Sequence, residues 1–209
     1  MNDEAVAEQL LKEGLSELLV EKHHYTALWH YLLLLKKWNK AYNLTAIREL
    51  PAMVNRHILD SLAIAPYLKG SRIIDVGTGA GLPGVVLAIT QPSREFVLLD
   101  SNGKKTRFLN EVKRSLNLLN LQVVQTRVES YHDTQTFDTV VSRAFSELDQ
   151  FIRWTKHLLA PQGIWLAMKG QHPESELQGI DLPYQIHSYQ VPKLESQRCV
   201  VIIQNQNKS

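Results

Sequence analysis

Apolar residues recur at intervals of three and four through the first 70 residues, which predicts helices there. A first helix begins at Asn2 or Asp3, either of which caps a helix N-terminus, and Gly14 is a suitable stop for it. A second helix is predicted over residues 22–42 and a third over residues 51–67. The second carries an apolar stripe typical of a helix packed on a core: Leu28, Tyr31, Leu32, Leu35, Trp38 and Tyr42.

From residue 72 the pattern changes to short apolar runs that alternate with amphipathic segments. The runs predict strands over residues 72–76, 95–99, 122–125, 137–141, 164–168, 184–191 and 198–204. Helices are predicted to begin beside Pro83 and to cover residues 104–116 and 148–159, with a surface loop over 171–183. This alternation indicates an α/β fold on a mostly parallel sheet. We therefore divide the chain into an N-terminal helical extension, residues 1–70, packed on an α/β domain, residues 71–209, as one compact structural unit.

Polar residues stand where the predicted strands end. In parallel α/β sheets ligands bind beyond the carboxyl ends of the strands, at the switch point of the strand order. The strand ends are therefore expected to bring together Gly77 to Gly81, Asp100, Glu129, Ser142, Arg143 and Lys169. An acid that ends the second strand, such as Asp100, is well placed to accept hydrogen bonds from ribose hydroxyls.

The first strand runs into a glycine-rich stretch, Asp75-Val76-Gly77-Thr78-Gly79-Ala80-Gly81-Leu82-Pro83-Gly84. A strand, a tight loop and a helix start open a nucleotide-type βαβ unit. Glycine lets the backbone approach a ligand and adopt positive φ. We expect the helix start to offer free N–H groups to an anionic group such as a carboxylate.

Two ligand classes fit this loop. Read from Gly79, it matches the dinucleotide pattern G-x-G-x-x-G, which leaves Gly77 and Thr78 unexplained. Read from Asp75, it gives D-x-G-x-G-x-G, the acid-led loop of S-adenosylmethionine-dependent methyltransferases. An acid near a strand end needs a partner, and a methionine ammonium supplies one. A glycine-rich turn without a ligand is the third interpretation.

The predicted third helix carries a polar group at helical spacing. Arg56 and Asp60 are four residues apart, with His57 and Ser61 beside them. Two interpretations stand side by side: a surface salt bridge of small value, or a polar face turned toward a site.

Composition excludes several classes. With 44% hydrophobic residues the chain has material for a core, and no apolar run approaches the ~18 residues that span a bilayer. The acidic start lacks the basic region of a signal peptide. The single cysteine, Cys199, cannot form an internal disulfide, so a cytoplasmic location is expected. No metal-ligand spacing is visible.

Charge is unevenly distributed, although the net charge is only +2. Residues 1–35 carry six acids and two bases, residues 36–114 carry thirteen bases and six acids, and the remainder carries eight bases and nine acids. A basic middle third suits a polyanionic substrate, and ordinary solvated side chains explain it equally well.

Four ordered motifs resemble the bacterial glucose-inhibited division protein B family: Trp38-Asn39-Lys40-x-x-Asn43-Leu44-Thr45, Arg56-His57-x-x-Asp60-Ser61, the glycine-rich stretch, and Ser142-Arg143-Ala144. The resemblance covers nearly the whole chain. Members of this methyltransferase G family are 16S rRNA methyltransferases that modify the 7-position nitrogen of one guanine, guanine 527 in the usual rRNA numbering. The resemblance therefore implies a class-I methyltransferase (Rossmann-like) fold, with a seven-stranded sheet whose last strand is antiparallel.

The resemblance also implies site residues. The family's S-adenosylmethionine contacts fall on Gly77, Leu82, Val128, Glu129 and Arg143, and the general class-I pattern adds Gly79, Gly81 and Asp100. Arg143 and Lys169 are the candidates for positioning groups at the reaction centre. The basic residues expected to hold the RNA are Lys36, Lys37, Lys40, Arg56, Lys104, Lys105 and Arg107.

The implied chemistry needs no general base, because the 7-position nitrogen of guanine has a free lone pair. The expected partner is 16S rRNA, in the small ribosomal subunit or an assembly intermediate of it, with no membrane and a monomeric enzyme. Two alternatives from other classes stay open: an NAD(P)-linked oxidoreductase, and a non-catalytic ribosome-binding module.

Overall fold

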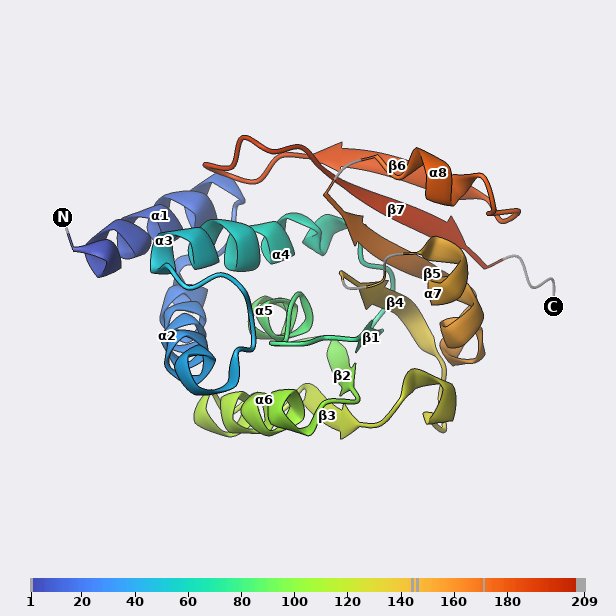
Figure 1. Ribbon diagram of the computed structural model, residues 1–209, viewed down its shortest axis with the longest axis horizontal. Helices are drawn as coiled ribbons and strands as arrows, with labels where there is room; N and C mark the ends of the chain where they lie inside the picture. Colours follow the sequence, from blue (N-terminus) through green and yellow to red (C-terminus); the bar gives the residue numbers. More distant parts are fainter. Residues whose placement is uncertain (1, 144, 146, 171, 206–209) are drawn as a thin grey trace.

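A computed structural model describes residues 2–143, 145, 147–170 and 172–205. Seven strands form one sheet in the order β3-β2-β1-β4-β5-β7-β6 (Figure 1). The strands are β1 (Arg72–Val76), β2 (Glu95–Asp100), β3 (Leu121–Gln125), β4 (Phe137–Ser142), β5 (Leu159–Lys169), β6 (Tyr184–Tyr189) and β7 (Arg198–Gln204). The predicted α/β class is confirmed.

The first five strands are parallel, and their residues are apolar because helices cover them. β1 pairs with β2 and β4, and Ile73 and Ile74 at its centre are buried. β7 is antiparallel to both β5 and β6, as expected for the last strand. β5 begins at Leu159, five residues earlier than predicted, because Phe137 of β4 pairs with it before a register shift.

The strand order reverses between β1 and β4. The chain runs from β1 outward to β2 and β3, then returns to β4 on the other side of β1. The helices of this part are α5 (Gly84–Thr90), α6 (Gly103–Ser115), α7 (Leu148–Thr155) and α8 (Glu174–Leu177), with short turns η4 (Val128–Ser130) and η5 (Lys156–Leu158). α8 lies within the stretch predicted as a loop. The carboxyl ends of β1 and β4 therefore form the switch point.

The N-terminal helices pack beside α5 and α6 at one end of the molecule (Figure 1). They are α1 (Asp3–Glu17), η1 (Lys22–His24), α2 (Tyr25–Tyr42), α3 (Leu50–Met53), η2 (Val54–Leu59), α4 (Asp60–Ala63) and η3 (Ala65–Tyr67). The hydroxyl of Tyr31 donates to the carbonyl of Ala80 at 2.7 Å, and the ring of Trp38 lies 5.7 Å from that of Phe108. One apolar core runs through both parts of the chain. The domain division at residue 70 stays a prediction.

Two details of the helices differ from expectation. Asn2 caps α1 as predicted, but Gly14 lies inside this helix and does not end it. A Cβ at Gly14 would overlap the side chain of Leu59, so the glycine permits close packing of α1 on η2. The predicted third helix is broken into α3, η2, α4 and η3, and η2 is a wide π-helical turn. None of the helices in the described part of the chain has the length and apolar composition needed to cross a bilayer.

Candidate functional site

The acid that ends β1 is hydrogen-bonded within the loop that follows it. Asp75 is buried, and its Oδ2 accepts from the Thr78 hydroxyl at 2.7 Å and from the Gly84 backbone N–H at 2.8 Å. Burial raises the pKa of this carboxyl to about 6, and the two hydrogen bonds oppose the rise. The first N–H of α5 is therefore not free for a ligand, contrary to expectation, because the protein's own carboxylate accepts it. A ligand ammonium near Asp75 stays a prediction.

The three glycines predicted as cofactor contacts have different roles in the structure. Gly77, at φ 67°, lines a cavity beside the loop. The N–H of Gly79 donates to Asp100 Oδ2 at 2.9 Å. Gly81 is needed for packing, because a Cβ there would overlap Val85. Leu82, the fourth predicted contact in the loop, is buried in the core.

Asp100, at the end of β2, organises the same loop. Its Oδ2 accepts from Gly79, its Oδ1 accepts from the Asn102 N–H at 2.9 Å, and the Lys105 ammonium lies 3.5 Å away. The carboxylate therefore joins the glycine-rich loop to the start of α6. It also lines the cavity, as predicted from its strand-end position.

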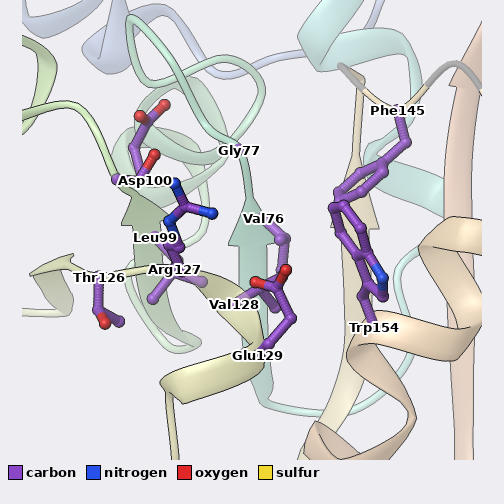
Figure 2. Close-up of a pocket in the computed structure, with 11 residues that line it drawn as sticks. Val76, Gly77, Leu99, Asp100, Thr126, Arg127, Val128, Glu129, Phe145 and Trp154 are labelled. Carbon is purple, nitrogen blue, oxygen red and sulfur yellow. The ribbon is translucent and has the colours of Figure 1, made fainter.

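The cavity beside the loop, hereafter the first cavity, has a volume of about 360 Å³. Its walls are unlike one another (Figure 2): Phe145 and Trp154 lie on one side, Leu99 and Arg127 lie on the other, and Val76 and Gly77 are between them. The lining residues are Val76, Gly77, Leu99, Asp100, Ser101, Thr126, Arg127, Val128, Glu129, Phe145 and Trp154. Phe145 and Trp154 offer flat apolar surfaces to the ring of a ligand, and Asp100 and Glu129 offer carboxylates to its hydroxyl groups.

Glu129 reaches from η4 into the space between these walls (Figure 2). Among the residues that the structure describes, its carboxylate has no hydrogen-bonding partner, in contrast to Asp100. It is therefore the better placed of the two acids to accept hydrogen bonds from a ligand.

A second cavity, of about 310 Å³, is lined by Arg143, which follows β4, and by Lys169 at the end of β5. Phe145 lines the first cavity, and its carbonyl accepts a hydrogen bond at 3.1 Å from Lys169, which lines the second. The residues around the second cavity are Ile47, Arg56, His57, Asp60, Arg143, Met168, Lys169, Gly170, Tyr189 and Arg198. The predicted polar strand ends thus divide between two neighbouring cavities.

The two predicted positioning residues line the second cavity. The Lys169 ammonium lies 2.6 Å from Glu176 of α8, and its side chain is 10% exposed. Arg143 donates through Nη1 to the carbonyl of Arg56 at 3.2 Å. Arg143 is absent from the lining of the first cavity, so its role as a cofactor contact stays a prediction. Ser142 is buried, and its hydroxyl donates to Val76 at 2.8 Å, which ties the ends of β4 and β1 together.

Asp60 faces the second cavity from the start of α4. Its Oδ1 accepts from the Tyr189 hydroxyl at 3.0 Å and lies 3.4 Å from Arg198 Nε, and Arg143 is 4.0 Å from its Oδ2. Burial raises the pKa of Asp60, and these guanidinium groups oppose the rise. The interpretation as a surface salt bridge between Arg56 and Asp60 is wrong, because Asp60 is buried and pairs with Arg143 and Arg198. The interpretation as a polar face turned toward a site stays a prediction.

His57 is held neutral beside Asp60. Its Nδ1 lies 3.0 Å from the carbonyl of Arg56, so this nitrogen carries the proton, and Nε2 accepts from the Thr45 hydroxyl at 2.9 Å. Burial, together with the positive charge of Arg143, lowers the pKa of His57 to about 4. The loop between α2 and α3 is thereby fastened to the second cavity.

The predicted RNA-binding residues lie on two neighbouring helices and at the second cavity. Lys104, Lys105 and Arg107 are at the start of α6, and Lys36, Lys37 and Lys40 are at the end of α2, which packs on α6. Arg56 is exposed and lines the second cavity. Arg48, which the sequence analysis missed, lies with Lys36 and Lys40 around a smaller hollow.

Several cavity residues carried no signal in the sequence. Tyr189 and Arg198 come from β6 and β7, where their alternation with apolar residues is that of any strand. Arg127 follows a predicted strand and Trp154 lies within a predicted helix, and neither belongs to a recognisable motif. Cys199 is buried, which raises the pKa of its thiol, and it lies in β7 as a packed residue. No group of three or more His, Cys, Asp or Glu with the geometry of a metal site occurs among the described residues.

Comparison with known proteins gives close relatives over the whole chain. The family described as "rRNA small subunit methyltransferase G" matches residues 24–201. "Ribosomal RNA small subunit methyltransferase G" of Legionella pneumophila (strain Philadelphia 1) is 56% identical over 208 residues, covering 100% of both chains. The protein of the same name from Ectopseudomonas mendocina is 50% identical, over 94% of this chain and 95% of the relative.

Solved structures resemble the fold at low identity. A SAM-dependent methyltransferase from Aquifex aeolicus has a TM-score of 0.56 at 18% identity, over 74% of this chain and 93% of that one. M. jannaschii TYW2 in complex with AdoMet has a TM-score of 0.54 at 15% identity, over 71% of this chain and 74% of that one. With the strand order given above, these likenesses confirm the class-I methyltransferase fold.

The buried, neutral His57 predicts a pH dependence of stability. Its pKa is about 4 in the folded chain and 6.5 ordinarily, so the unfolded chain binds the proton first as the pH falls. The stabilising contribution of His57 is present above about pH 6.5 and is lost as the pH falls through about 4. Relative to His57→Gln, the wild type should lose up to about 3 kcal/mol of unfolding free energy between about pH 7 and pH 4.

Urea unfolding of both proteins across this range measures the difference. The exposed His30 of α2 provides the control, and His30→Gln should follow the wild-type pH profile. A constant difference between wild type and His57→Gln at every pH would contradict a neutral, buried ring.

Proposed function

Because the chain belongs to the rRNA small subunit methyltransferase G family, we propose that it transfers a methyl group from S-adenosylmethionine to the 7-position nitrogen of a guanine in 16S rRNA. By the family resemblance, the acceptor is guanine 527 in the usual rRNA numbering. The observation that carries the proposal is the pair of neighbouring cavities at the switch point, one fitted to a nucleoside and the other lined by basic residues.

The residues of the first cavity fit S-adenosylmethionine. Phe145 and Trp154 offer apolar surface to an adenine ring, and the unpartnered carboxylate of Glu129 suits the ribose hydroxyls. When bound, this cofactor supplies a methyl group on a sulfonium. The acceptor lone pair would attack the methyl carbon in line, and the sulfur would leave as a thioether. Gly77 keeps the wall beside β1 free of a side chain.

The second cavity suits the acceptor base and its phosphates. A hydrogen bond from Lys169 to the Phe145 carbonyl connects it to the first cavity, and Arg56, Arg143, Lys169 and Arg198 line it. Attack by the 7-position nitrogen of guanine requires no proton removal, and alignment of the two reactants supplies much of the rate, up to ~7–11 kcal/mol in favourable cases. We assign Arg143 and Lys169 a positioning role, because both are fixed by bonds to the protein backbone.

The RNA backbone is proposed to lie along the basic surface of α6 and α2. The loop between α2 and α3 continues from this surface to the second cavity, since Asn39 bonds to Thr45 and Thr45 to His57. An RNA strand following this path passes Arg48 of the loop and reaches the basic residues of the second cavity.

Labelled methyl transfer tests the proposed reaction. With radiolabelled S-adenosylmethionine, the purified chain should place one methyl group on each small-subunit RNA, and cleavage chemistry specific for 7-methylguanine should locate it. Small ribosomal subunits and naked 16S rRNA are compared as substrates. Subunits already methylated with unlabelled cofactor are the control and should accept no label. Absence of transfer to either substrate would favour a non-catalytic ribosome-binding protein, and label on another atom would exclude the 7-position.

Glu129→Ala should weaken binding of S-adenosylmethionine by about 10-fold to 100-fold, the loss expected for hydrogen bonds to a charged group. Calorimetry with S-adenosylmethionine and with S-adenosylhomocysteine separates two causes. Equal weakening of both ligands indicates lost ribose bonds, whereas weakening of the sulfonium ligand alone indicates lost charge attraction. Glu195→Ala removes an exposed glutamate outside the first cavity and should leave both affinities unchanged. Unchanged affinities in Glu129→Ala would remove this residue from the site.

Removing two basic residues at the start of α6 should weaken RNA binding and its dependence on salt. For the double variant Lys104→Ala/Arg107→Ala, the slope of log affinity against log salt should fall by about 0.7 to 0.9 for each phosphate group that the variant no longer neutralises. The matched control, Arg153→Ala/Lys156→Ala, removes two exposed bases from α7 and η5 at the far side of the sheet (Figure 1). Filter-binding titrations over a salt series measure both. Equal slopes in the two double variants would place the RNA elsewhere.

A further inference from the structure

One buried carboxylate stands among the basic residues of the second cavity. Arg56, Arg143, Lys169 and Arg198 line this cavity, and Asp60 is the acid among them. Basic residues there suit the phosphates of an RNA. A carboxylate repels the same phosphates and costs free energy to bury, so its presence calls for a separate reason.

The two oxygens of Asp60 differ in their bonding. Oδ1 accepts from the Tyr189 hydroxyl at 3.0 Å and has Arg198 Nε at 3.4 Å. Oδ2 has only Arg143, at 4.0 Å, which is beyond hydrogen-bonding distance, among the residues that the structure describes. The nearby Nη1 of Arg143 donates instead to the carbonyl of Arg56. Asp60 lines the second cavity, so the carboxylate oxygen that lacks a donor from the described residues is available to a molecule that enters this cavity.

The backbone around Asp60 fixes where this oxygen points. The π-helical turn η2 ends at Leu59, directly before Asp60, and wide turns of this kind occur frequently at functional sites. The hydroxyl of Ser61, the next residue, donates to the carbonyl of His57 at 2.6 Å. Tyr189 and Arg198 hold the other carboxylate oxygen from β6 and β7. The carboxylate is thus positioned from two sides before any substrate arrives.

We propose that Oδ2 of Asp60 accepts hydrogen bonds from the ring N1–H and the exocyclic amine of the acceptor guanine, and thereby selects guanine over adenine. The inference rests on the proposed function. A carboxylate is an acceptor only, and guanine presents two adjacent donors on its pairing edge. Adenine has a lone pair at ring position 1, which faces the carboxylate unfavourably and leaves the buried acid unpaired.

The same contact leaves the reacting atom accessible. The pairing edge and the 7-position nitrogen lie on opposite sides of a purine, so a base held by Asp60 presents this nitrogen away from the carboxylate. Arg143 and Lys169 line the same cavity, and their positive charge suits the oxygen at position 6, next to N1. Enzymes that act on an extruded base commonly read its pairing edge in this way.

Replacing the acceptor guanine by inosine tests the contact, because inosine lacks only the exocyclic amine. Small-subunit RNAs carrying guanine or inosine at the acceptor position are assembled into the form that wild type methylates, and kcat/KM is measured for each. Wild type should prefer guanine by about 10-fold to 100-fold. In Asp60→Asn, whose amide presents a donor or a weaker acceptor, this preference should fall below about 3-fold.

Tyr189→Phe is the matched control, because it removes a partner of Oδ1 and leaves Oδ2 in place. This variant should keep the wild-type preference even if it is slower. Any effect of inosine on RNA folding is the same for every enzyme, so it cancels when the preference of a variant is divided by that of wild type. Calorimetry with S-adenosylmethionine verifies that Asp60→Asn is folded.

Two outcomes contradict this inference alone, and a third contradicts the proposed function as well. If an active wild type does not distinguish guanine from inosine, or if Asp60→Asn keeps the wild-type preference, Asp60 is only a support for Arg143 and Arg198, and the proposed methylation stands. If wild type transfers no methyl group to the guanine RNA, the proposed function and this inference both fail.

Discussion

The site depends on one buried carboxylate. Oδ2 of Asp75 accepts from Thr78 and from Gly84, and so holds the glycine-rich loop at its start and at its end. Burial disfavours the charge and raises the pKa to about 6, so the loop keeps these bonds against a desolvation cost. These bonds hold the loop so that Gly77 lines the first cavity and α5 begins directly after the loop.

A second buried acid is held in a different way. Both hydrogen bonds to Asp75 come from the loop that follows it, at Thr78 and Gly84. Asp60 instead accepts from Tyr189, a residue 129 positions away, and lines the second cavity, whereas Asp75 lines neither cavity. Asp75 therefore organises the loop around it, and Asp60 is accessible to a molecule that enters the cavity. Burial alone does not separate the two roles; the partners of each acid and the cavity linings do.

Local patterns predicted the sheet and the loop, because a parallel strand and its following turn are encoded within a few residues. The strand ends, the glycine loop and the basic helix α6 lie where the sequence placed them. Three features required distant contacts. Gly14 continues its helix because Leu59 packs on it, η2 widens within an ordinary helical pattern, and Asp60 finds Tyr189 at a separation of 129 residues. No periodicity carries information over such a distance.

Phe145 and Lys169 join the linings of the two cavities. Phe145 contributes its ring to the first, while its carbonyl accepts from Lys169 of the second. Lys169 also donates to Glu176, whose carboxylate accepts from the first amide of α7, at Leu148. In a transfer that needs no general base, the distance and direction between donor and acceptor are the main contribution that a protein makes to the rate. The bonds that connect β5, α8 and α7 join the two linings to one another, and so serve this alignment.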